Sequence, residues 1–148
     1  MERFLGPDII KQVKEVFEPL ENPVEILFFS SQANCELCDE TIQLLNEVAE
    51  IAPDKIFVSA HDKDEEVELA QQYHIDKAPM FVIGAREDGK LVDYGIRFSG
   101  IPAGHEFTSL ITTILDIGSP STKLEKASIE FLEGLKEPVN LMVFVTPT

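Results

Sequence analysis

Apolar and polar residues follow one another along the first 118 residues in two periods, one typical of helices and one typical of strands. Apolar positions three and four apart predict helices at residues 7–19, 41–51, 67–73 and 107–115. Apolar runs rich in β-branched and aromatic residues predict strands at residues 24–30, 55–60, 80–83 and 91–98. A polar turn at residues 86–90 joins the last two strands into a hairpin. This order predicts an α/β fold with a central mixed β-sheet flanked by helices.

The last thirty residues repeat a pattern from the start of the chain. The run PVNLMVF at residues 138–144 matches PVEILFF at residues 23–29, at an offset of 115. We therefore expect a helix at residues 121–134 and a strand at residues 139–145. The alternative is a C-terminal decoration of the first unit that adds an edge strand.

The repeat divides the chain into two predicted domains. Residues 1–118 form a complete unit, and residues 119–148 form the truncated start, helix and strand, of a second unit. An uncovered apolar strand at residues 139–145 would invite pairing. We expect it to dock on the first unit or to pair with another chain, which would make a homo-oligomer.

Charge and composition restrict the classes of function. Twelve Lys and Arg residues against 27 Asp and Glu residues leave a net charge of −15, and the basic residues form no cluster. Such a chain would be repelled by a phosphate backbone, so we expect no nucleic-acid partner. The chain shows neither a secretory h-region nor a segment of membrane-spanning length, which predicts a soluble cytoplasmic protein without a membrane partner.

The two cysteines of the chain, Cys35 and Cys38, are three residues apart at the point where a predicted strand gives way to a helix. This spacing suits thiol–disulfide exchange, which needs one attacking thiolate and a second thiol within bridging reach. The helix N-terminus would stabilise a thiolate on Cys35, so Cys35 is the predicted attacker and Cys38 the resolving thiol. The acidic neighbours Glu36, Asp39 and Glu40 oppose this ionisation, which favours a pair that donates electrons.

Two other interpretations of the cysteines stay open. A zinc site would need further ligands, and the histidines of the chain, His61, His74 and His105, are scattered without paired spacing. We expect these histidines to be surface or loop residues and expect no metal site. The cysteines could also be two ordinary buried thiols, but their place in a strand-to-helix loop argues against it.

The C-x-x-C after the first core strand, followed by Ala78-Pro79 before a hairpin, resembles the thioredoxin fold. The resemblance implies that Pro79 is cis and faces the cysteine pair. It also implies that the backbone of Ala78 pairs with an extended substrate segment, a form of strand addition. The alternative is a proline that simply starts a strand.

More narrowly, the chain resembles the protein disulfide oxidoreductases of thermophilic prokaryotes, also called glutaredoxin-like proteins. The resemblance rests on the extra N-terminal helix, the stretch FSGIPAGHEF at residues 98–107 and the restarting repeat. It implies a tandem of thioredoxin-like units that uses its dithiol as the redox group, without an added cofactor. The implied partners are cysteine-containing protein substrates and a flavin-dependent reductase similar to thioredoxin reductase.

The sequence also departs from ordinary thioredoxins. Asn34 stands where a Trp is usual, Glu36-Leu37 replaces Gly-Pro, and Phe29 replaces a buried Asp. Glu25, on the same predicted face as Phe29, is a weak substitute for that proton acceptor. The function predicted from the sequence is thiol–disulfide exchange with protein disulfides, and the alternative is a non-catalytic thioredoxin-like interaction module.

Overall fold

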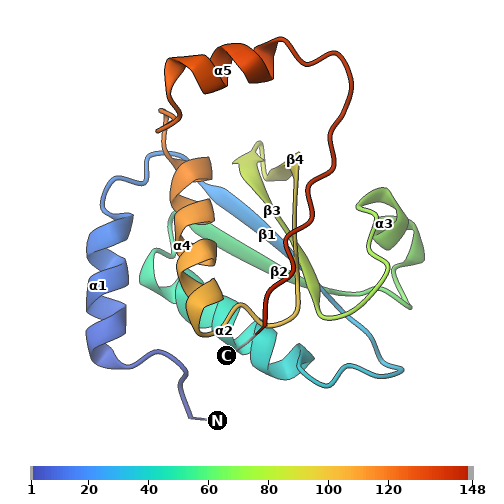
Figure 1. Ribbon diagram of the computed structural model, residues 1–148. Helices are drawn as coiled ribbons and strands as arrows, with labels where there is room; N and C mark the ends of the chain where they lie inside the picture. The colour runs from blue at the N-terminus through green and yellow to red at the C-terminus, as the bar shows by residue number, and fades with distance from the viewer. Residues whose placement is uncertain (1, 147–148) are drawn as a thin grey trace.

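The computed structural model describes residues 2–146, and its centre is a four-stranded sheet with the strand order β2-β1-β3-β4 (Figure 1). β1 runs parallel to β2 and antiparallel to β3, and β4 is antiparallel to β3. The sheet is therefore mixed, with β2 and β4 at its edges. The strand bounds are β1 (Val24–Ser30), β2 (Ile56–Asp62), β3 (Met80–Glu87) and β4 (Lys90–Ser99).

Helices cover both faces of this sheet, three on one face and one on the other (Figure 1). The first face packs against α1, α2 and α4, and the second packs against the short helix α3. None of the helices in residues 2–146 is long and apolar enough to cross a lipid bilayer. The helix bounds are α1 (Pro7–Phe17), α2 (Cys38–Ile51), α3 (Val67–Gln72), α4 (His105–Gly118) and α5 (Lys126–Glu133).

Alternation along β1 divides the core into two clusters. Val24, Ile26 and Phe28 point toward α1, α2 and α4, whereas Leu27 and Phe29 point toward α3. β1 is buried along nearly its whole length because it has a neighbour on each side and helices on each face. A strand in this position needs apolar side chains on both faces, which agrees with the apolar run in the sequence of β1.

The predicted fold class is confirmed: the chain has a thioredoxin-like fold with an N-terminal helix before β1. The first predicted strand agrees with β1 at both ends, and the structure extends the third from residue 83 to residue 87. The extension follows from the hairpin, in which β3 pairs with β4 up to Glu87 and Lys90. The apolar run in the sequence ends at residue 83, whereas the pairing of β3 with β4 continues to Glu87.

Residues 119–146 differ from the predicted arrangement. The predicted helix at 121–134 is present in shorter form as α5, but residues 139–145 form no strand. Val139, Leu141, Met142, Val143, Phe144 and Val145 are all exposed, so the prediction of a strand at this place is wrong for the described chain. A strand exists only as part of a ladder, and no ladder forms here. That residues 119–148 begin a second unit stays a prediction.

Candidate functional site

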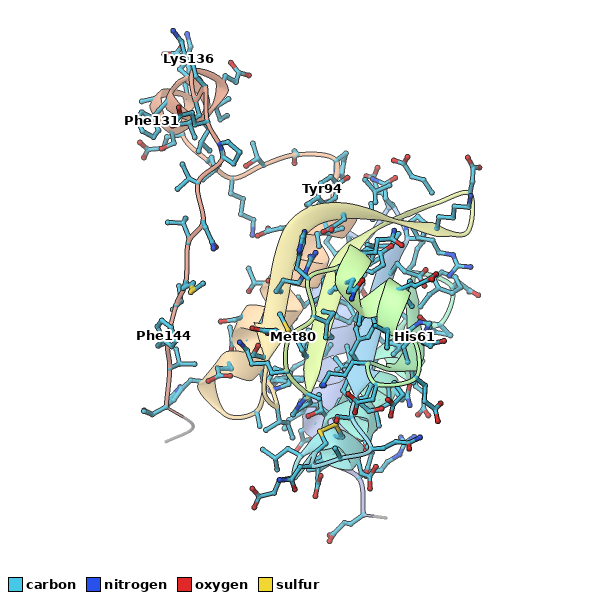
Figure 2. All side chains as sticks on the ribbon, turned by 90° about the vertical axis from the view of Figure 1, so that its right-hand side faces the viewer. His61, Met80, Tyr94, Phe131, Lys136 and Phe144 are labelled. Atoms are coloured by element: carbon cyan, nitrogen blue, oxygen red, sulfur yellow. A yellow bond between two sulfur atoms is a disulfide. The ribbon has the colours of Figure 1, made fainter. Side chains whose placement is uncertain are left out.

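The two cysteines form a disulfide bond at the start of α2, where the loop after β1 turns into the helix. Their Cα atoms are 5.4 Å apart. Cys38 is the first residue of α2 and is buried in the main core, whereas Cys35 lies in the preceding loop and is half-buried. Figure 2 shows the sulfur–sulfur bond at the lower end of the domain. Cys35 is therefore the more accessible sulfur.

The N-terminus of α2 favours negative charge beside the cysteine pair. Leu37 occupies the N-cap position and has no side-chain oxygen to accept from the first amides of the helix. These amides and the positive end of the helix dipole lie next to the cysteine pair, and they favour a negative charge there. Thr41 bonds back to the Leu37 carbonyl through its N–H and its hydroxyl, at 3.0 Å and 2.6 Å, which fixes the first turn.

The loop that carries Cys35 is attached to the loop between β2 and α3. The Ser31 hydroxyl donates to Asp64, and the Gln32 amide donates to Glu65. The hydrogen bonds that Lys63 and Ser31 donate to Asp64 hold the pKa of that carboxyl below its ordinary value. Sequence reasoning missed this attachment, because nothing in the local pattern pairs residues 31–32 with residues 64–65.

Ala78 and Pro79 lie at the end of the sheet that also holds the cysteines. Phe29 of β1 is opposite Met80 of β3, so Pro79 is level with Ser30, the last residue of β1. The Ala78-Pro79 peptide bond is cis, as the resemblance implied. Ala78 and Cys35 both pack against the main core. Among residues 2–146 no hydrogen bond reaches the backbone of Ala78, whereas the Pro79 carbonyl accepts from the Gly100 N–H at 2.9 Å.

Glu25 does not serve the cysteines as a proton acceptor. It lies near the start of β1, and the cysteines follow the end of that strand about 15–20 Å away. Its carboxylate is buried and accepts a hydrogen bond from the Arg86 guanidinium at 2.5 Å. That guanidinium also lies over the ring of Phe57, 4.0 Å from its centroid. Glu25 is therefore part of a structural ion pair.

The three histidines lie apart from one another. His61 is half-buried on β2, where its Nδ1 contacts Glu66 and its Nε2 lies 3.0 Å from the Ser59 hydroxyl. His74 and His105 are exposed, one after α3 and one at the start of α4. Residues 2–146 contain no cluster of His, Cys, Asp and Glu that could hold a metal ion. His61 is half-buried on a strand, which differs from the predicted surface or loop position.

Comparison with known proteins places the chain beside larger redox proteins. No protein-family model matches the sequence. The F subunit of alkyl hydroperoxide reductase from Staphylococcus epidermidis is 31% identical over 144 residues, which cover 97% of this chain and 25% of that protein. The chain therefore spans about a quarter of the length of such curated relatives. The sequence patterns described above did not point to these reductases.

Solved structures show the same kinship. The F subunit of alkyl hydroperoxide reductase from Enterococcus faecalis, as a C503A mutant, matches with a TM-score of 0.78 and 29% identity, over 90% of this chain and 62% of that one. A protein disulfide oxidoreductase from Aeropyrum pernix matches with a TM-score of 0.76 and 24% identity, over 88% of this chain and 55% of that one. The second match supports the predicted resemblance at the level of the fold. The chain is a thioredoxin-like domain by its fold, it carries a C-x-x-C disulfide, and its sequence is similar to part of these hydroperoxide reductase proteins.

Proposed function

We propose that this domain is a thiol–disulfide oxidoreductase that exchanges its Cys35–Cys38 dithiol with the disulfides of proteins. The observation that carries the proposal is the geometry of the pair, with a bridged, buried Cys38 behind a more accessible Cys35 at the N-terminus of α2. A purely structural disulfide would gain nothing from an uncapped helix N-terminus beside it. An exchanging pair gains a stabilised thiolate.

The exchange proceeds in two steps. The Cys35 thiolate attacks one sulfur of the substrate disulfide, which forms a mixed disulfide and releases the other substrate sulfur as a thiolate. Cys38 then loses its proton and attacks Cys35, which restores the Cys35–Cys38 bond and releases the second substrate thiolate. The substrate disulfide gains two electrons and two protons, and the protein dithiol loses them.

Ala78 and Pro79 are the proposed substrate-binding residues. The N–H and C=O of Ala78 have no hydrogen-bonding partner in residues 2–146, and the residue lies at the end of the sheet that holds the cysteines. An extended substrate segment could satisfy both groups as an added strand, and this would place its sulfur beside Cys35. The cis bond turns the chain at this point.

We propose further that the pair donates electrons. Glu36, Asp39 and Glu40 lie within five residues of Cys35 and make no ion pair in the described chain. Their charge disfavours the Cys35 thiolate and offsets part of the helix effect. The measurement is a titration of thiolate absorbance in Cys38→Ser, and ionisation of Cys35 below about pH 5 would contradict the proposal.

The relatives suggest where the electrons come from. Their name describes part of a hydroperoxide reductase, and this chain matches about a quarter of their length. We propose that the Cys35–Cys38 disulfide is itself reduced by a flavin-dependent reductase domain or partner, and that the dithiol then passes the electrons to a cysteine-containing protein. The disulfide is the redox group within this chain.

The test is reduction of insulin by dithiothreitol, followed by turbidity, with the wild-type chain, Cys35→Ser and Cys38→Ser. We expect the wild-type chain to accelerate the reaction and Cys35→Ser to abolish the acceleration. Cys38→Ser, reduced beforehand and mixed with insulin after the dithiothreitol has been removed, should accumulate a mixed disulfide with insulin, visible on a non-reducing gel. Equal rates for the wild-type chain and Cys35→Ser would overturn the proposal in favour of a non-catalytic interaction module.

A further inference from the structure

One face of α2 carries a polar stripe that starts beside the disulfide and runs along the helix. Its residues recur at helical spacing and line a shallow hollow of about 420 Å³ together with Arg3. The stripe consists of Asp39, Ile42, Gln43, Asn46, Glu47 and Glu50. Three of its six residues are carboxylates, and the end nearest the disulfide is Asp39.

The far half of this stripe is already covered by the N-terminal segment of the chain, residues 2–5. Glu47 accepts hydrogen bonds from the N–H groups of Phe4 and Leu5, at 3.2 Å and 2.9 Å, and Gln43 donates to the Glu2 carbonyl at 2.8 Å. Arg3 from the same segment pairs with Glu50. This half of the stripe thus binds backbone N–H and C=O groups together with one cationic side chain.

The start of α2 beside the cysteines, which includes Asp39 of the stripe, is uncovered. Asp39 and Glu36 are exposed, Glu40 is half-buried, and none of the three has an ion-pair partner in residues 2–146. We call these three residues the acidic rim. Residues 31–40 contain no Lys or Arg that could neutralise it. Leu37, 40% exposed between them, adds an apolar contact.

The surroundings leave this negative charge in place. The loop at residues 62–66, attached to the loop of Cys35, has four carboxylates and one cation, and that cation, Lys63, pairs with Asp64. Lys77, next to Ala78, pairs with Asp76. The surface around the cysteines therefore keeps its negative charge.

We propose that the acidic rim binds a segment of the partner protein that carries Lys or Arg side chains next to its reactive cysteine. The inference rests on the proposed function and names the class of partner that the same site prefers. Attraction between unlike charges raises the rate of encounter and orients the approaching segment. A partner with acidic residues at the same place would be repelled.

The experiment compares two peptides that differ only in charge. Each carries one cysteine as a pyridyl disulfide, flanked by three Lys residues in one peptide and by three Ser residues in the other, and release of thiopyridone reports the attack by reduced protein. We expect the Lys peptide to react about tenfold faster at low ionic strength. The ratio should approach one at about 1 M salt, where the Debye length is about 3 Å.

Two triple variants locate the effect. Glu36→Gln, Asp39→Asn and Glu40→Gln together should bring the ratio of the two rates close to one, and any change in the intrinsic reactivity of Cys35 cancels in this ratio. The control is Glu15→Gln, Glu18→Gln and Glu21→Gln, which removes the same charge from exposed positions near the opposite end of β1. The control variant should keep most of the wild-type ratio between the rates of the Lys peptide and the Ser peptide.

The outcomes separate the two proposals. Equal rates for the two peptides with the wild-type chain would overturn the inference and leave the oxidoreductase standing. An equal loss of the ratio in both triple variants would also overturn it, because the overall charge of −15 would then explain the preference. Failure of the wild-type chain to react with either peptide would overturn the proposed function, and the inference with it.

Discussion

Two segments of similar sequence have opposite surroundings in this molecule. Residues 23–29 include all of β1 except Ser30, and β1 is one of the two central strands, while residues 138–144 repeat the pattern and lie on the surface. Phe29 is 0% exposed, and Phe144, at the matching position, is 88% exposed. Figure 2 shows the chain around Phe144 running apart from the sheet. An apolar run therefore becomes a strand only where neighbouring strands can pair with it and a helix can cover it.

The ion pairs of the two regions differ in the same way. Glu25 and Arg86 pair inside the folded unit, where the carboxylate is buried. Lys126 and Glu130 pair across one turn of α5 at 3.6 Å, with side chains 90% and 62% exposed. A buried pair cannot lose one member without leaving a charge out of water, whereas water replaces either member of an exposed pair.

The largest effect is expected for matched phenylalanines. Phe29→Ala should lower the free energy of unfolding by about 3–5 kcal/mol, because it empties a fully buried site beside Tyr73 and His61. Phe144→Ala should change it by less than about 0.5 kcal/mol. Urea unfolding of the oxidised protein measures both. A loss above about 1 kcal/mol for Phe144→Ala would mean that residues 139–145 pack against the unit in solution.

The next effect concerns the buried ion pair. Arg86→Ala should cost about 3 kcal/mol, the lower end of the usual range, because the Arg86 side chain is 30% exposed and water can reach the vacated site. Lys126→Ala, the matched change in the exposed region, should cost less than about 0.5 kcal/mol. The same unfolding measurement compares them. Equal costs would show that burial of Glu25 does not govern the strength of its pair.

Much of the folded unit could be predicted from the sequence because its elements are locally specified. β1, α1 and α4 each carry an apolar pattern that matches their covered faces, and Pro7 starts α1 where the pattern begins. The failure at residues 139–145 has a physical cause: a strand depends on partners distant in the sequence, which hydrophobicity does not reveal. The shorter α5 agrees with its weak burial, since packing supplies most helical stability.

At the site, too, local features could be predicted from the sequence, whereas contacts between distant residues could not. The spacing of Cys35 and Cys38 and their place before a helix are local features, and the structure brings them together in a disulfide. The partner of Glu25 is not local, because Arg86 is 61 residues away, so alternation could place the carboxylate on a face without naming what it meets. Glu47 lies within the predicted helix at residues 41–51, but the segment that it binds is 42 residues earlier, so the local pattern does not reveal its role.

A smaller effect is expected from that buried carboxylate. Burial raises the pKa of Glu47, but hydrogen bonds from Gln43 and from the Leu5 and Phe4 N–H groups, with the charge of Arg3, lower it by more, so its pKa lies below the ordinary value. The folded state thus favours the ionised form. This contribution is present above the ordinary Glu pKa and is lost as pH falls through the lowered one.

Glu47→Gln should therefore cost about 1–2 kcal/mol near pH 7, and the difference from the wild-type chain should shrink below about pH 4. Urea unfolding at a series of pH values measures this, and Glu137→Gln in the exposed region serves as the control, with an expected change below about 0.5 kcal/mol. A cost that stays constant from about pH 7 to about pH 3 would show that the carboxylate charge does not hold the N-terminal segment.

The smallest effect on stability, and the most direct test of the exposed region, is expected for Val143→Lys. Val143 is 85% exposed, so the free energy of unfolding should change by less than about 0.5 kcal/mol. Self-association should weaken, because an exposed apolar run invites pairing between chains and a charge in its middle opposes it. Sedimentation velocity over a range of protein concentrations measures this, with Val67→Lys on the exposed start of α3 as the control. If the wild-type chain and Val143→Lys sediment identically, residues 139–145 do not join chains, and their sequence similarity to β1 has no role in assembly.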